Sequence, residues 1–203
     1  MKKLRFMVMA LILVSLVFHV TGCKTARVSK NDVNFALIII DIQNDYFDGG
    51  RFTLHNSLGA LNNTESILRQ FRDRGLPVIH VQHINPRGAG FFEPGTWGVE
   101  IHERVKPLEN EALIVKHQIS SFAGTELEKI LKDKDINRLI ICGMQSNVCV
   151  EATAKDAVLL GFQVIILEDA CAALTTDAHD GAMERLQTDF FRATILNTNE
   201  FVF

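Results

Sequence analysis

Short apolar runs recur along the chain and alternate with segments whose apolar residues lie three or four positions apart. Continuous apolar runs are typical of parallel strands buried on both faces, and the wider spacing is typical of amphipathic helices. The pattern predicts strands at residues 35–40, 77–83, 112–115, 139–142, 163–167 and 192–196. It predicts helices at residues 62–74, 125–131, from 149 onward and at 176–190.

This alternation indicates an α/β protein. It predicts a doubly wound, Rossmann-like and mostly parallel six-stranded sheet with helices on both faces. Such sheets bind ligands at the carboxyl ends of their strands, near the point where the strand order reverses. Three reactive residues lie at such ends: Asp41 after the first strand, Lys116 after the third and Cys149 after the fourth.

The segment 138–153 predicts a nucleophile. It begins as a buried strand, breaks at Gly143 and continues from Cys149 with helical spacing. A thiol in the first turn of a helix faces free backbone N–H groups and the positive end of the helix dipole, and both favour the reactive thiolate. The alternative is that Cys149 is one more small buried hydrophobic residue, which is the usual role of a free cysteine.

Composition narrows the function classes. The chain has 203 residues, enough for one domain with a substantial core, and its 47% apolar and 22% charged content is that of a globular protein. The net charge of −3 argues against nucleic acid as a partner. The expectation of a small-molecule substrate rests on the candidate chemistry and the resemblance described below.

The first residues predict export. Residues 1–22 combine a basic start with an apolar run at 6–18, which is shorter than the roughly 20 residues of a membrane span. The ending Val-Thr-Gly-Cys23 resembles the lipobox of bacterial lipoproteins, and this implies cleavage before Cys23 and lipid on its thiol. Residues 23–34 then form a tether and 35–203 the folded domain. The alternatives are an uncleaved anchor and an ordinary cleaved signal.

The three strand-end residues form a coherent chemical set. Lys116 would stabilise the Cys149 thiolate, and Asp41 would take the thiol proton and deliver it to a leaving amine. Backbone N–H groups between Gln145 and Cys149 would hold a developing oxyanion. These parts suit hydrolysis of an amide or carbamoyl compound through a thioester, without a cofactor. Taken singly, Asp41 could be a loop residue and Lys116 a solvated one.

Three segments carry a family resemblance. Residues 37–47, LIIIDIQNDYF, resemble the opening motif of the isochorismatase-like cysteine hydrolases, residues 115–125 the lysine motif of that family and residues 142–153 its nucleophile motif. The resemblance covers about residues 35–174. It implies the isochorismatase-like hydrolase fold, the catalytic triad Asp41, Lys116 and Cys149, and a homo-oligomer.

The resemblance also implies a non-proline cis peptide bond between Met144 and Gln145. By analogy, this bond would aim the N–H groups of Gln145 and Cys149 at the oxyanion. Isochorismatases proper cleave a vinyl ether and lack the nucleophilic cysteine, so Cys149 argues against that reaction.

The chain departs from the metal motif of nicotinamidases. These relatives bind a metal through an Asp-x-His cluster after the second strand, where this chain has His80-Val-Gln-His83. Two residues three apart on a regular strand point to opposite faces. We therefore expect no metal and disfavour nicotinamidase.

Several further residues stay open at this point. Phe47, His83, Trp97 and Phe122 are tentative substrate contacts, and the loop at 85–98 could cover the pocket or pack between subunits. His179 is expected on a helix surface. Cys142 is expected in the core and Cys171 just past a strand, both reduced. The competing functions are a binding protein without turnover and a thiol redox protein, although no Cys-x-x-Cys is present.

The export prediction is tested by processing in a bacterial host. We expect globomycin, which blocks lipoprotein signal peptidase, to cause the unprocessed precursor to accumulate, with lipid on Cys23 in the mature protein of untreated cells. An unprocessed and unlipidated product in the cytosol of untreated cells would contradict the prediction.

Overall fold

The computed structural model describes residues 34–188 and 190–203. The predicted signal peptide, Cys23 and all of the predicted tether except its last residue lie outside the described residues. No helix within the described residues is long and apolar enough to cross a membrane.

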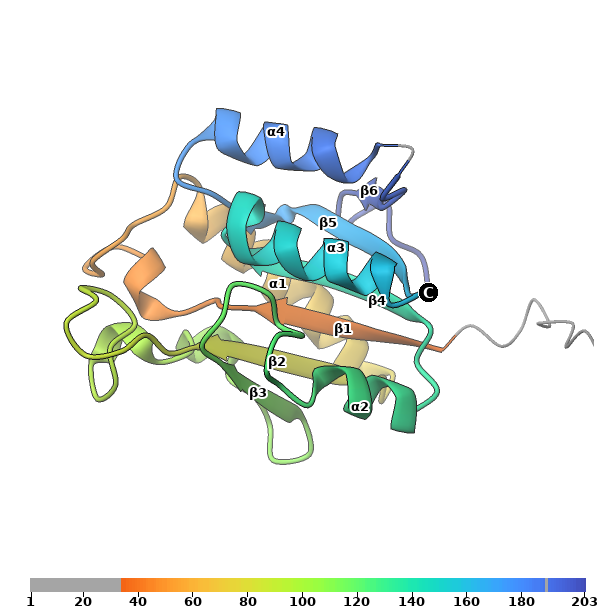
Figure 1. The fold of residues 1–203 in the computed structure, drawn as a ribbon, viewed down its shortest axis with the longest axis horizontal. Helices are drawn as coiled ribbons and strands as arrows, with labels where there is room; N and C mark the ends of the chain where they lie inside the picture. Colours follow the sequence, from red (N-terminus) through yellow and green to blue (C-terminus); the bar gives the residue numbers. More distant parts are fainter. Residues whose placement is uncertain (1–33, 189) are drawn as a thin grey trace, which may run out of the picture. The chain divides into compact units, whose positions relative to one another are not determined.

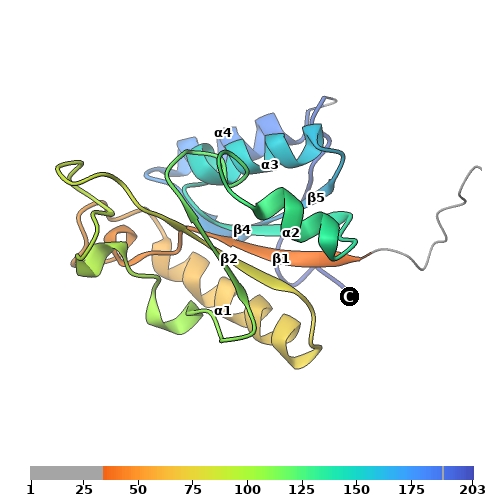
Figure 2. The ribbon, with the colours of Figure 1, turned by 60° about the horizontal axis from the view of Figure 1, so that its bottom comes forward.

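The described chain forms a six-stranded parallel sheet in the order β3-β2-β1-β4-β5-β6 (Figure 1), which confirms the predicted architecture. The strands are β1 (Phe35–Ile40), β2 (Val78–His83), β3 (Ala112–Lys116), β4 (Arg138–Met144), β5 (Gln163–Ala172) and β6 (Thr194–Leu196). The helices are α1 (Ser57–Asp73), α2 (Leu127–Asp133), α3 (Glu151–Leu159) and α4 (Thr176–Leu186). Figure 2 shows α1 on one face of the sheet and the other three helices on the opposite face.

The core follows from the apolar runs of the sequence. β1 lies between β2 and β4, and its residues Leu37 to Ile40 are almost completely buried because helices cover both sides of the sheet. On α1, the apolar residues at helical spacing, including Leu61, Leu68 and Phe71, are buried in the same core. The hydrophobic effect thus fixes both the strand and the helix that covers it.

Helix boundaries differ from the predicted ones. α1 begins at Ser57, five residues before the predicted start at 62, and includes Gly59, which the pattern left outside the helix. A Cβ on Gly59 would come within 2.3 Å of Asn56 Oδ1, so this glycine permits the tight entry into the helix. α4 ends at Leu186 rather than at 190, and its first turn is capped by Thr175, whose hydroxyl accepts from the Ala178 N–H.

β5 extends five residues beyond its predicted end at 167. The register with β4 shifts between Ile141 and Gly143, so that Gly143 pairs with Cys171 and the polar residues Glu168 and Asp169 occupy an irregularity within the strand. Cys171 therefore lies inside β5 and not past it. Cys142 and Cys171 are free and buried, as expected.

Gly143, next to this register shift, lies closer to a neighbouring strand than any other described glycine with a positive φ. Gly143 has φ +133°, and a Cβ there would lie 2.1 Å from the Ile40 carbonyl oxygen. Gly161 has φ +90°, and a Cβ added there would meet no atom within 4 Å. The two glycines share a backbone constraint but differ in the space beside them.

We expect Gly143→Ala to lower the free energy of unfolding by more than about 3 kcal/mol, because strain and a backbone clash add. Gly161→Ala should cost only about 1–2 kcal/mol of strain. Urea unfolding of both variants measures the difference. Equal destabilisation would show that the contact between β1 and β4 at Gly143 is not tight.

Candidate active site

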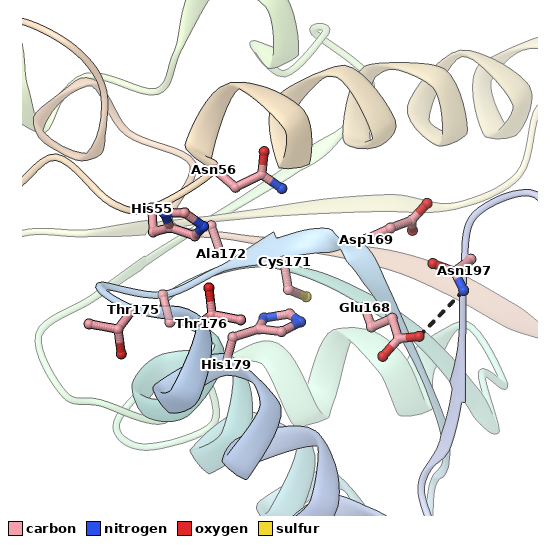
Figure 3. A pocket seen from close by; sticks show the side chains of 11 residues that line it. His55, Asn56, Glu168, Asp169, Cys171, Ala172, Thr175, Thr176, His179 and Asn197 are labelled. Carbon is pink, nitrogen blue, oxygen red and sulfur yellow. Dashed lines mark hydrogen bonds between the residues drawn. The ribbon is translucent and has the colours of Figure 1, made fainter.

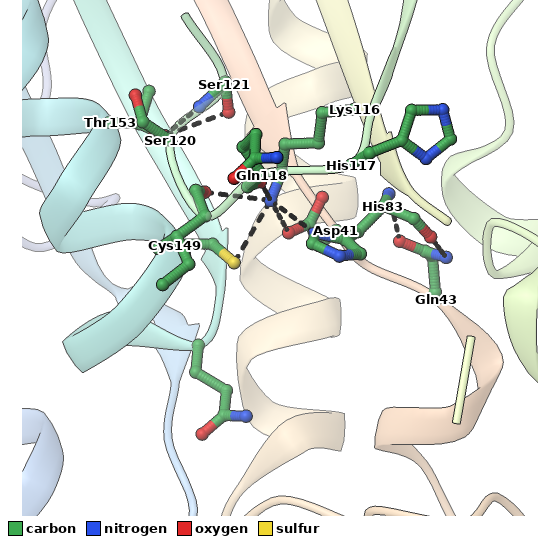
Figure 4. A network of polar contacts seen from close by, with 12 residues as sticks. Asp41, Gln43, His83, Lys116, His117, Gln118, Ser120, Ser121, Cys149 and Thr153 are labelled. Carbon is green, nitrogen blue, oxygen red and sulfur yellow. Dashed lines mark hydrogen bonds and ion pairs between the residues drawn. The ribbon is translucent and has the colours of Figure 1, made fainter. Parts of the chain in front are cut away.

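The structure brings Asp41, Lys116 and Cys149 into one buried cluster (Figure 4). Lys116 Nζ lies 2.8 Å from Asp41 Oδ2 and 3.2 Å from Cys149 Sγ. The exposed fractions of the three residues are 0% for Asp41, 1% for Lys116 and 6% for Cys149. A carboxylate, an ammonium and a thiol therefore meet where little water reaches them.

Parallel strands position the two charged residues. Asp41 directly follows β1, with φ 51°, and its N–H donates to the carbonyl of Val81 in the neighbouring β2. Lys116 is the last residue of β3 and pairs in register with His83 of β2. Since β2 separates β3 from β1, the lysine side chain passes the end of β2 to reach Asp41.

The nucleophile loop differs from its predicted form. Cys149 lies in a π-helical turn, Ser146–Val150, ahead of α3, and not in the first turn of an α-helix. The Gln145 carbonyl accepts from the N–H groups of Val148 and Val150, both at 3.1 Å. The peptide bond joining Met144 to Gln145 is cis, which is the bond that the sequence analysis named.

Two hydrogen bonds attach this loop and α3 to their surroundings. Ser146 Oγ lies 2.8 Å from His179 Nδ1 of α4, so His179 is partly buried against the loop and is not simply a helix surface residue. The Ser121 N–H donates to Thr153 Oγ1 over 2.9 Å, which joins the segment after Lys116 to α3. Hydrogen bonds to α3 and α4 thus help to position both the nucleophile loop and the segment that follows Lys116.

His83 is a fourth member of the cluster. Its Nδ1 lies 2.9 Å from Lys116 Nζ, and its Nε2 lies 2.9 Å from Asn85 Oδ1. An ammonium can only donate, so Nδ1 accepts and Nε2–H donates to Asn85. Burial and the neighbouring lysine charge lower the pKa of His83 to about 4, which keeps the imidazole neutral at physiological pH.

Burial also changes the nucleophile. It raises the pKa of the Cys149 thiol to about 12, the charge of Asp41 adds to the rise, and Lys116 opposes it. Burial likewise raises the pKa of the Asp41 carboxyl above its usual range, against the effect of Lys116. The expected resting thiolate is therefore wrong: the site rests as a thiol beside a carboxylate of raised basicity, which is suited to accept the thiol proton.

Of the tentative substrate contacts, His83 touches the triad directly, through its hydrogen bond with Lys116. Phe47 is buried and packs on His102, with ring centroids 4.6 Å apart. Trp97 is 58% exposed. The ring of Phe122 stacks on that of Phe162, with centroids 6.0 Å apart. Phe162 follows α3 and is not a residue of the cluster. Substrate contact by any of the four stays a prediction.

Tyr46 was missed by sequence reasoning. Burial raises the pKa of its hydroxyl, and the charge of Asp41 adds to the rise, which places Tyr46 in the electrostatic field of the cluster. Its ring packs against Phe92 of the loop at 85–98, with centroids 4.7 Å apart, and the ring of Phe92 lies 6.2 Å from that of His83. Phe92 therefore brings the loop at 85–98 next to Tyr46 and His83. Sequence offered no signal that separates this tyrosine from an ordinary core residue.

A separate pocket is lined by residues of β5 and α4, among others (Figure 3). It has a volume of about 260 Å³, and His179, which bonds to Ser146, forms part of its wall together with Cys171. The other lining residues are His55, Asn56, Glu168, Asp169, Ala172, Ala173, Thr175, Thr176 and Asn197. Cys171 and His179 thus line a second hollow and not the catalytic cluster.

The two histidines of β2 have different partners. His80 Nε2 lies 2.8 Å from Glu111 Oε2, whereas His83 contacts Lys116. Within the described residues, the one group of three metal-ligand side chains is Asp41, His83 and Cys149, whose ligand atoms lie within 4.8 Å of one another. This group coincides with the catalytic cluster.

The chain is similar to proteins of a known family. Residues 35–200 match the model of the isochorismatase domain. The chain belongs to the isochorismatase family. It is 47% identical over 146 residues to an uncharacterized isochorismatase family protein of Bacillus subtilis, covering 71% of this chain and 81% of that one. Membership makes this chain a hydrolase of the isochorismatase type.

Solved structures show the same fold. An isochorismatase hydrolase from Oleispira antarctica is 35% identical with a TM-score of 0.78, covering 83% of this chain and 96% of that one. An N-carbamoylsarcosine amidase from Thermoplasma acidophilum is 25% identical with a TM-score of 0.75, covering 83% of this chain and 99% of that one. One relative of similar fold is thus an amidase.

Asp41→Asn should make the Cys149 thiolate form at lower pH, by on the order of 1–2 pH units, because it removes the negative charge that raises the thiol pKa. Ultraviolet thiolate absorbance against pH measures the midpoint. The same substitution in a Cys149→Ala background subtracts the signal of the other cysteines. A midpoint that is unchanged or higher would contradict the electrostatic account.

Proposed function

We propose that this family member is a cysteine-dependent amidohydrolase that cleaves the C–N bond of a small amide or carbamoyl compound through a thioester. The observation that carries the proposal is the buried Lys116 ammonium, which contacts both Asp41 and Cys149. The amidase named among the solved relatives supports the same reaction class.

In the first half-reaction, Cys149 Sγ attacks the carbonyl carbon while its proton passes to Asp41. Lys116 keeps its charge and stabilises the sulfur as negative charge develops on it. We assign the oxyanion to the N–H groups of Gln145 and Cys149. The C–N bond then breaks, the amine takes the proton from Asp41, and the acyl group remains on sulfur as a thioester.

In the second half-reaction, water attacks the thioester carbonyl and Asp41 accepts a proton from it. The C–S bond breaks, the acid leaves, and Cys149 regains its proton. Burial raises the pKa of the Asp41 carboxyl above its usual range, which makes it a stronger base toward the thiol and water protons than an exposed aspartate would be. Neutral His83 accepts from Lys116 and so holds the ammonium in place.

Two other functions are compatible with this fold, a nicotinamidase and a binding protein without turnover. A nicotinamidase would share the triad but hydrolyse a pyridine carboxamide, and a binding protein of this fold would release nothing. Export, lipid attachment at Cys23 and homo-oligomer formation are likewise proposals, since they rest on sequence patterns and resemblance alone. Export and lipid attachment are separable from the chemistry, because the catalytic residues lie between 41 and 149, after the predicted signal peptide and tether.

Soluble protein starting at Lys24 should release ammonia from one or more members of a panel of small primary amides, lactams and carbamoyl compounds, nicotinamide included. Cys149→Ala should lower this rate by at least about 10³-fold, because the nucleophile is lost. Ammonia production is followed with a coupled assay.

Cys171→Ala is the matched control, since it removes a buried thiol outside the cluster. It should keep the hydrolysis rate. Turnover that survives in Cys149→Ala would contradict the thioester route, and silence of the wild type over the whole panel would favour the binding protein.

A further inference from the structure

Five electron-donating atoms surround the Lys116 ammonium (Figure 4). Asp41 Oδ2 lies at 2.8 Å, His83 Nδ1 at 2.9 Å and Cys149 Sγ at 3.2 Å from Nζ. The carbonyl oxygens of Gln118 and Ile119 lie at 3.1 Å and 2.9 Å. An ammonium has three N–H donors. Five acceptor atoms therefore surround a group that can donate only three hydrogen bonds. Such a convergence of electron-donating atoms on one centre resembles the ligand shell of a metal ion.

The three side chains in this shell are metal ligands by type. A carboxylate, an imidazole and a thiolate are the ligand classes that bind Zn²⁺ and Co²⁺. Their ligand atoms already lie within 4.8 Å of one another. Bonds from zinc to such ligands measure about 2.0–2.3 Å, so the shell would need to contract around an ion, and the lysine would have to leave.

We propose that the Lys116 ammonium occupies a latent transition-metal site formed by Asp41, His83 and Cys149, and that it keeps borderline-soft divalent cations out of the catalytic cluster. The physical reason is that the ammonium fills the centre of the shell and its charge repels a second cation at short range in a buried site. The lysine would thus make the thiol chemistry independent of metals that capture thiolates. This inference goes beyond the proposed hydrolysis and concerns binding alone.

The test is a Co²⁺ titration of the full chain in mild detergent without oxygen. Lys116→Ala removes the charge and leaves room, so it should bind one Co²⁺ with the thiolate-to-cobalt charge-transfer absorption. Lys116→Met removes the charge but keeps the bulk, and should bind more weakly than Lys116→Ala. Lys129→Ala, which removes an exposed lysine, should behave like the wild type and show no such absorption.

Ligand identity is tested in the Lys116→Ala background. Adding Cys149→Ala should abolish the charge-transfer absorption. Adding His83→Ala should weaken Co²⁺ binding by more than the roughly 10- to 100-fold that loss of an outer-shell partner costs. Lys116→Asn replaces Lys116→Ala if the latter fails to fold, because its amide can still donate to the Gln118 or Ile119 carbonyl.

Two results would overturn the proposal. The first is a wild type that binds one Co²⁺ with the charge-transfer absorption, and this result does not depend on any variant. The second is a folded Lys116→Ala or Lys116→Asn protein that shows none. Neither readout uses a substrate, so a failed hydrolase proposal and a failed metal proposal are distinguishable.

Discussion

The buried ion pair between Lys116 and Asp41 is the interaction on which the site depends. Taking a carboxylate and an ammonium out of water is costly, and their attraction offsets this cost only with close contact and further hydrogen bonds. The structure provides close contact, since the pair lies at 2.8 Å, and it provides further hydrogen bonds on the lysine side, where the ammonium also contacts His83 and the carbonyls of Gln118 and Ile119. Loss of either partner would leave an uncompensated buried charge.

The parallel sheet makes this pair possible. Asp41, His83 and Lys116 lie at the carboxyl ends of three adjacent strands, and Cys149 follows β4 on the other side of β1. Residues more than a hundred positions apart thus meet at the point where the strand order reverses. The close approach of Gly143 to Ile40 lets β4 pack against β1 just before the nucleophile loop begins.

Much of this arrangement could be predicted from sequence, because it depends on local patterns. Apolar runs indicated all six strands and their polar ends indicated Asp41 and Lys116, whereas the break at Gly143 and the helical spacing after it indicated Cys149. The extension of β5 could not be predicted, because it depends on pairing between Gly143 and Cys171 across a register shift, and Glu168 and Asp169 resemble loop residues locally.

The electrostatics of the site were less predictable than its residues. The expected thiolate followed from a helix dipole and a nearby lysine, whereas the protonated thiol follows from burial and from the negative charge of Asp41. Burial of a side chain is set by the whole fold. For the same reason the sequence did not reveal that His83 accepts a hydrogen bond from Lys116, or that Tyr46 lies next to the cluster.

Neutron diffraction from a deuterium-exchanged crystal at neutral pH would show whether Cys149 rests as a thiol beside an ionised Asp41, because it locates the protons that ordinary crystallography leaves unseen. We expect a deuteron on Cys149 Sγ, none on Asp41 and none on His83 Nδ1, with Lys116 carrying a full ammonium. A bare sulfur beside a protonated Asp41 would contradict this expectation.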